Sequence, residues 1–147
     1  MVSQRYQIDL NGHLADCEMN FRRLQKLLPS STAAGDCLRF GVATDAIEVL
    51  VKECAPYTTM IELRLARPLF ADMPAPTLHV RIYHDANLAE VMGASGLRPP
   101  RPRYSYPNAG MYQRDEKAQQ NRYLGEWLSL CLSLGRSLDN PLNILET

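Results

Sequence analysis

The stretch Leu78-His-Val-Arg-Ile-Tyr-His-Asp-Ala-Asn-Leu-Ala-Glu-Val-Met92 decides the fold expected for this chain. Its first half alternates apolar and polar residues, which is typical of a β-strand with one buried face. Its second half repeats apolar residues three and four positions apart, which is typical of an amphipathic helix. Asp85 stands between the halves and could cap a helix N-terminus. The sequence therefore predicts a strand over Leu78–His84 that leads directly into a helix over Ala86–Met92.

Two longer helices are predicted near the ends of the chain. From Asp9 to Leu28, apolar residues recur at steps of three and four, and Pro29 then ends the helix. The second helix runs from Arg114 to Leu134, and Gly135 can end it in a left-handed conformation. Each helix thus has one apolar stripe that must be buried against another element.

Three further strands are expected between the first helix and the opening stretch, over Cys37–Val42, Ala46–Cys54 and Tyr57–Ala66. Their short connections favour antiparallel pairing, because a parallel pair needs a long crossover. The predicted fold class is α+β, a four-stranded antiparallel sheet with the N- and C-terminal helices packed on one face. Charged residues should form a solvated lattice of cross-strand ion pairs on the other face: Arg39, Glu48, Lys52, Glu62, Arg64 and Arg81.

The length of 147 residues fits a single domain over 1–147, with residues 136–147 as a C-terminal tail. Hydrophobic residues make up 46% of the chain, yet no window approaches the roughly 18 apolar residues of a membrane span. The first residues lack the apolar core of a secretion signal. We therefore expect a cytoplasmic protein that does not associate with membranes.

The four cysteines, Cys17, Cys37, Cys54 and Cys131, lack the close spacing of a zinc knuckle or a redox dithiol. We interpret them as free, buried thiols that fill the core. The sequence predicts no metal site and no cofactor, since glycine-rich phosphate loops and nucleophile elbows are also absent from it.

Arginine and tyrosine gather in one segment although the whole chain is neutral, with 16 basic and 16 acidic residues. The balanced total argues against a nucleic-acid-binding protein. The window from Leu97 to Tyr123, however, contains six basic and two acidic residues. Guanidinium groups clamp anionic oxygens, and phenol rings offer a stacking surface. The predicted ligand-binding residues are Arg98, Arg101, Arg103, Tyr104, Tyr106, Arg114 and Lys117.

A structural interpretation of the same segment stays open. The cations could pair with acids such as Asp85 or Glu90, and the tyrosines could pack on the rim of the sheet.

A second group of residues could carry chemistry, namely His84, Asp85, Asp115 and Glu116. A histidine with several carboxylates can bind a divalent metal or perform acid–base catalysis. The alternative is structural, with His84 hydrogen-bonded in the core, Asp85 as a cap and the other two as acids in the first turn of a helix. The structural roles are favoured, because clusters of ionisable residues are often structural.

Several unusual runs occur in order between Cys17 and Gly135: Cys17-Glu-Met-Asn-Phe21, Leu27-Leu-Pro29, Tyr57-Thr-Thr59, Val80-Arg-Ile-Tyr-His-Asp-Ala86, Ala89-Glu-Val91, Tyr104-Ser-Tyr-Pro-Asn108, Gln113-Arg-Asp-Glu-Lys117 and Glu126-Trp-Leu128. Together they resemble the YqiB-like family of small bacterial proteins, a domain of unknown function. The resemblance implies no established activity, cofactor or catalytic residue.

The sequence favours a non-enzymatic binding or adaptor module that recognises a nucleotide-like anionic ligand or a partner protein through the Arg/Tyr segment. The alternative is a small hydrolase that acts on a phosphorylated substrate through the His/Asp/Glu group. A homodimer is compatible with either hypothesis.

Overall fold

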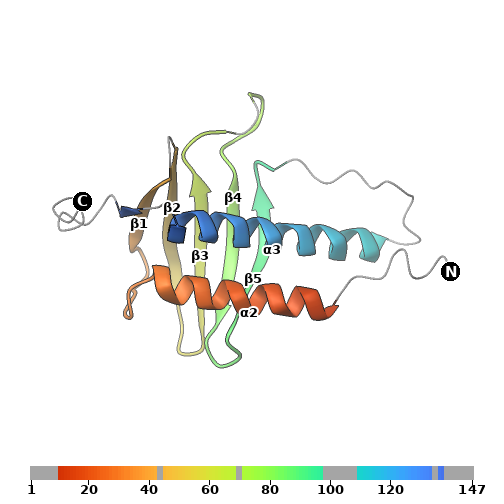
Figure 1. The fold of residues 1–147 in the computed structure, drawn as a ribbon, viewed down its shortest axis with the longest axis horizontal. Helices are drawn as coiled ribbons and strands as arrows, with labels where there is room; N and C mark the ends of the chain where they lie inside the picture. Colours follow the sequence, from red (N-terminus) through yellow and green to blue (C-terminus); the bar gives the residue numbers. More distant parts are fainter. Residues whose placement is uncertain (1–9, 43–44, 69–70, 98–108, 134–135, 138–147) are drawn as a thin grey trace.

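The structure is a computed structural model that describes residues 10–42, 45–68, 71–97, 109–133 and 136–137. It contains two long helices on one side of an antiparallel sheet (Figure 1). The elements in chain order are α2 (Leu10–Leu27), β1 (Cys37–Val42), β2 (Asp45–Cys54), β3 (Thr58–Leu65), β4 (Thr77–Tyr83), β5 (Leu88–Ser95), α3 (Ala109–Ser133) and β6 (Arg136–Ser137). The predicted α+β class and the helices at both ends are confirmed.

The strands follow the order β5-β4-β3-β2-β1-β6, and every neighbouring pair is antiparallel. The prediction of four strands was wrong, because β5 adds a full-length strand at one edge. At the other edge β6 pairs Arg136 with Gly41 and Ser137 with Phe40. The first two residues of the predicted tail therefore belong to the sheet, and residues 138–147 lie outside the described part.

The helix predicted over Ala86–Met92 is the error behind the wrong strand count. Four turn residues follow β4, and Asn87 adopts a left-handed backbone with φ of 56°, which asparagine tolerates better than most residues. The chain therefore reverses into a hairpin, and Asp85 lies in the turn, where it caps no helix. Ala89 and Val91 alternate on the inner face of β5, but the register shift opposite His79 and Val80 interrupts the alternation that would have revealed a strand.

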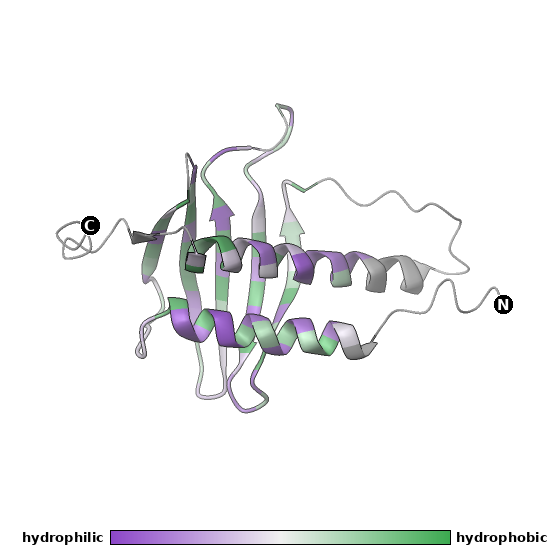
Figure 2. Cartoon of the chain, in the orientation of Figure 1, coloured by the Kyte–Doolittle hydropathy of each residue, from purple (hydrophilic) through white to green (hydrophobic). Residues whose placement is uncertain are grey.

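Helices α2 and α3 lie side by side, run in the same direction and cross the strands (Figure 1). A hydrogen bond from Asn20 to Asn121 joins them, and Gly125 lets α2 approach closely, since a Cβ there would lie 3.1 Å from Arg23 Nη1. Hydrophilic and hydrophobic residues alternate along α2 and along the coloured part of α3 (Figure 2). One face of each is therefore free to pack on the sheet.

The core lies between the helix pair and the inner face of the sheet. Most apolar residues of the two predicted helical stripes are buried there, although Leu14, which belongs to the stripe predicted between Asp9 and Leu28, is 48% exposed. The buried core residues from the helices are Phe21, Leu24, Leu124, Trp127, Leu128 and Cys131. Those from the sheet are Phe40, Val42, Ile47, Val49, Val51, Ile61, Leu63, Leu78, Val80, Ile82, Ala89 and Val91.

The outer face of the sheet carries ion pairs for five of the six predicted residues, whereas Nε of Arg81 lies 3.1 Å from the sulfur of Met60. Arg39 pairs with Glu48 across β1 and β2 at 3.7 Å. Glu62 has three basic neighbours, which are Lys52 at 3.9 Å, Arg64 at 3.8 Å and His79 at 3.3 Å. Such exposed pairs contribute little stability each, so the face is held mainly by the core beneath it.

Two of the four cysteines are buried as predicted, and the other two are not. Burial raises the pKa of the Cys17 and Cys131 thiols from 9.0 to about 11, and nearby Glu90 adds to the effect at Cys17. Cys37 and Cys54 lie near strand ends and are exposed, so the prediction of a core role was wrong for them.

No helix within the described ranges is long and apolar enough to cross a membrane.

Candidate functional site

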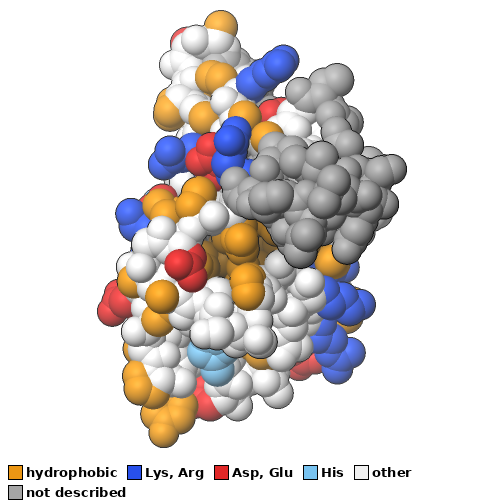
Figure 3. Space-filling view, turned by 90° about the vertical axis from the view of Figure 1, so that its left-hand side faces the viewer, with side chains coloured by type: hydrophobic (Ala, Val, Ile, Leu, Met, Phe, Trp, Pro, Cys, Tyr) orange, Lys and Arg blue, Asp and Glu red, His pale blue; other side chains and the backbone are white. Residues whose placement is uncertain are grey.

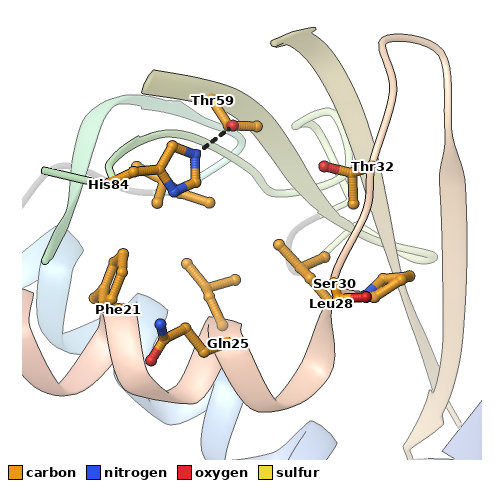
Figure 4. A pocket seen from close by; sticks show the side chains of 10 residues that line it. Phe21, Gln25, Leu28, Ser30, Thr32, Thr59 and His84 are labelled. Atoms are coloured by element: carbon orange, nitrogen blue, oxygen red, sulfur yellow. Dashed lines mark hydrogen bonds between the residues drawn. The ribbon is translucent and has the colours of Figure 1, made fainter. Parts of the chain in front are cut away.

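A cleft with a volume of about 340 Å³ lies between the C-terminal half of α2 and the inner face of the sheet. Apolar side chains form much of its wall, and polar groups stand among them (Figure 4). Its lining residues are Phe21, Leu24, Gln25, Leu28, Pro29, Ser30, Thr32, Thr59, Ile82 and His84. The end of the molecule at which α2 stops also shows hydrophobic side chains gathered in a recess (Figure 3).

The helical wall of the cleft follows from the spacing of residues in α2. Phe21, Leu24, Gln25 and Leu28 lie at steps of three, one and three, so they share one face of the helix. The backbone N–H of Leu28 still donates to the Leu24 carbonyl at 2.8 Å, and Pro29 then stops the helix. The chain that leaves the helix forms the next part of the wall, at Ser30 and Thr32.

The sheet contributes the opposite wall through β3 and β4. Thr59 pairs with Ile82 in the antiparallel register, and both side chains belong to the buried inner face. His84 follows two residues after Ile82, so strand alternation directs it toward the same side. Its backbone N–H donates to the Tyr57 carbonyl at 2.8 Å, which holds the start of the hairpin turn against β3.

Thr59 and His84 form the main polar contact in the cleft. The hydroxyl oxygen of Thr59 lies 2.7 Å from Nε2 of His84, and the dashed line in Figure 4 marks this hydrogen bond. Thr59 is 5% exposed, whereas His84 is exposed. Phe21 faces this pair from α2, and the side chain of Gln25 lies along the same helix beside it (Figure 4). The cleft therefore offers a hydroxyl and an imidazole beside an apolar wall, which is the usual composition of a small-molecule site.

The predicted catalytic residues do not converge in the described structure. His84 lines the cleft, but Asp85 does not. Glu116 lies on α3, where Gln120 donates to its Oε1 at 3.5 Å. The side chain of Asp115 lies outside the described part. Within the ranges described, no group of three or more His, Cys, Asp or Glu side chains could hold a metal ion, and no carboxylate forms an ion pair with His84.

The predicted anion-binding residues fall almost wholly outside the described side chains. Residues 98–108 are not described, and of Arg114 only the helical backbone is. Lys117 is described, and its ammonium lies 2.5 Å from Oε1 of Glu90. Lys117 therefore follows the structural interpretation, in which a cation of this segment pairs with an acid, because the carboxylate of Glu90 neutralises it.

Sequence reasoning missed a buried polar network that joins α2, α3 and β5. Asn20 and Asn121 have no exposed surface. Oδ1 of Asn121 accepts the backbone N–H of Val91 at 3.0 Å, and its Nδ2 donates to the Lys117 carbonyl at 2.9 Å. Nδ2 of Asn20 donates to the Asn121 carbonyl at 3.0 Å. The sequence contains one signal of this network. Asn20 and Asn121 occupy positions on the buried faces of the helices, at which apolar side chains are expected.

The cleft residues Gln25 and Thr59 were also missed as site residues. Thr59 is a hydroxyl residue within a run of apolar inward-facing positions in β3, a signal that the alternating pattern does contain. Gln25 gives no such signal, since an exposed glutamine on a helix is ordinary.

A model of a family described as a protein of unknown function (DUF1249) matches residues 23–137. The chain is 37% identical over 132 residues to the uncharacterized protein YqiB of Escherichia coli strain K12, and to the YqiB proteins of strains O6:H1 and O157:H7. Each alignment covers 90% of this chain and 94% of the relative. No solved structure matches the fold significantly. The chain therefore belongs to the YqiB-like, DUF1249 family of unknown function, as its sequence runs indicated.

Proposed function

We propose that this chain is a non-enzymatic binding module that holds a small ligand in the cleft beneath α2. The observation that carries the proposal is the placement of the Thr59–His84 hydrogen bond beside an apolar wall. Leu24 and Ile82 can cover an apolar part of a ligand, and burial of each methylene contributes about 0.8 kcal/mol to binding. The hydroxyl and imidazole can then orient a polar part, which gives specificity.

A larger hollow, of about 630 Å³, supports this proposal less well. It lies between the outer faces of α2 and α3, and its walls carry charged groups such as Asp16, Arg23 and Glu126. Arg23 already donates to Oδ1 of Asn20 at 2.8 Å, so its guanidinium serves the helix contact. The cleft under α2 is the site with an apolar wall and a convergent polar pair.

Ser30→Trp is expected to weaken binding of the neutral fluorescent dye N-phenyl-1-naphthylamine about tenfold or more, a loss of about 1.4 kcal/mol. Ser30 is exposed and lines the cleft, so the indole would occupy the space without disturbing the core. The matched control is Ser31→Trp, because Ser31 is exposed next to it and does not line the cleft. The dye is titrated against both variants and the unmodified chain. Equal affinities for all three proteins would contradict the proposal.

Recognition of a nucleotide-like anion or of a partner protein by the Arg/Tyr segment is a separate part of the proposal, at a different site from the cleft. It depends on the cations of residues 98–114 being free of acidic partners, whereas Lys117 is paired with Glu90. Calorimetric titration with nucleotides should show salt-sensitive binding that Arg101→Ala together with Arg103→Ala abolishes, since guanidinium groups supply the charge-assisted hydrogen bonds. Binding that is unchanged in this double variant would reject the segment as the recognition surface.

A hydrolase is the second candidate function, and one observation favours it. A hydroxyl bonded to an imidazole is the first half of a nucleophile–base arrangement. The second half is a group that orients the base, and no described carboxylate pairs with His84. Ligand binding is therefore the better supported of the two candidate functions.

A further inference from the structure

A second hollow adjoins the cleft along the same face of α2. Its volume is about 320 Å³, and it shares two wall residues, Phe21 and Gln25, with the cleft. The hairpin bounds both spaces on the other side, with His84 at the cleft and Asn87 at the second hollow. The two spaces therefore follow one another between α2 and the β4–β5 hairpin.

The second hollow is polar and carries one charge of each sign. Glu18 and Arg22 line it from α2, together with the amide groups of Gln25 and Asn87. The two charged residues are four positions apart, a spacing that favours an ion pair on a helix. Both are exposed, and in the described part of the chain neither forms an ion pair. A carboxylate and a guanidinium thus face the hollow without neutralising each other.

We propose that the second hollow binds the charged head group of an apolar α-amino acid whose side chain occupies the cleft. The carboxylate of such a ligand would accept two hydrogen bonds from the Arg22 guanidinium, and its ammonium would donate to Glu18. Side chains four apart on a helix begin about 5–6 Å from each other, so both can reach one α-amino acid head group. This inference rests on the proposed binding function of the cleft and names its ligand class.

The charge balance of the hollow selects this class over a simple anion or cation. A simple anion would gain from Arg22 but would meet the negative charge of Glu18. A simple cation would face the opposite conflict. A zwitterion satisfies both groups, and Leu24 and Ile82 of the adjoining cleft can then cover its apolar side chain.

The test is calorimetric titration of the full chain with four compounds. L-Leucine carries both charges and an apolar side chain, N-acetyl-L-leucine lacks the ammonium, L-leucinamide lacks the carboxylate, and glycine lacks the side chain. We expect L-leucine to bind best and each of the others to bind about tenfold more weakly, because each loses one charge-assisted or apolar contact.

Three variants assign the contacts. Arg22→Gln should remove the preference for L-leucine over L-leucinamide, and Glu18→Gln the preference over N-acetyl-L-leucine. Lys26→Gln is the matched control, because it removes a charge from an exposed position of the same helix that lines neither space, and it should change neither preference. Two outcomes would overturn the proposal of a zwitterionic ligand and leave the cleft proposal intact. One is equal affinity for the three leucine compounds, and the other is no binding of any of them while N-phenyl-1-naphthylamine still binds. If the unmodified chain binds neither the leucine compounds nor the dye, the zwitterion proposal and the cleft proposal are both overturned.

Discussion

Asn121→Ala is expected to lower the free energy of unfolding by about 3 kcal/mol, a large effect for one polar residue. Asn121 is fully buried, and its Oδ1 is the acceptor for the backbone N–H of Val91. Alanine would leave that donor buried and unpaired, and it would also remove the hydrogen bond to the Lys117 carbonyl. Urea unfolding of the two proteins measures the difference.

Two further measurements make this prediction specific. Arg122→Ala changes the next residue of α3, which is exposed, and should shift the free energy of unfolding by no more than about 0.5 kcal/mol. Hydrogen exchange at the Val91 amide should become faster in Asn121→Ala, because its acceptor is gone. A loss of stability below about 1 kcal/mol, with unchanged protection at Val91, would show that this contact does not hold α3 against β5.

Gly96→Ala is expected to destabilise the protein by about 2–4 kcal/mol, for two separate reasons. Gly96 has a φ of +77°, in a region that residues with a Cβ avoid. A Cβ there would also lie 2.6 Å from the Pro74 carbonyl oxygen and 2.8 Å from that of Ala75. These are backbone atoms, so they cannot turn away as a flexible side chain would.

Two other glycines separate these reasons. Gly35 has a φ of +95°, but no heavy atom lies within 4 Å of the position that a Cβ would take, so Gly35→Ala should cost only the backbone strain, about 1 kcal/mol. Gly93 has neither problem, and Gly93→Ala in strand β5 should be neutral or slightly stabilising. Thermal or urea unfolding of the three variants should give that order. An equal effect in all three would contradict the close contact at Gly96.

The elements that were predicted well are those whose pattern is long and local. The bounds of β1 were predicted to the residue, and α2 and α3 were recognised from their apolar stripes. β5 was missed because the spacing of its apolar residues fits the period of a helix as well as the alternation of a strand. What decides between them is the unpaired edge of β4, a partner that lies outside any local window.

The candidate site was less predictable than the fold. The sequence singled out His84, but it grouped this residue with acids, and neither Asp85 nor Glu116 lines the cleft or forms an ion pair with it. The true neighbours, Thr59 and Phe21, are 25 and 63 positions away along the chain. Such contacts arise from strand register and helix packing, which composition and spacing do not encode at the level of single residues.

The most direct test of the central claim is where a neutral apolar probe binds. Methyl-labelled protein is mixed with N-phenyl-1-naphthylamine, and nuclear Overhauser contacts between dye and methyl protons are measured by NMR. We predict contacts to the methyl groups of Leu28 and Ile82, which line the cleft. Contacts confined to Leu130 and Leu132, which are 41% and 39% exposed on α3, would contradict the claim that the cleft is the binding site.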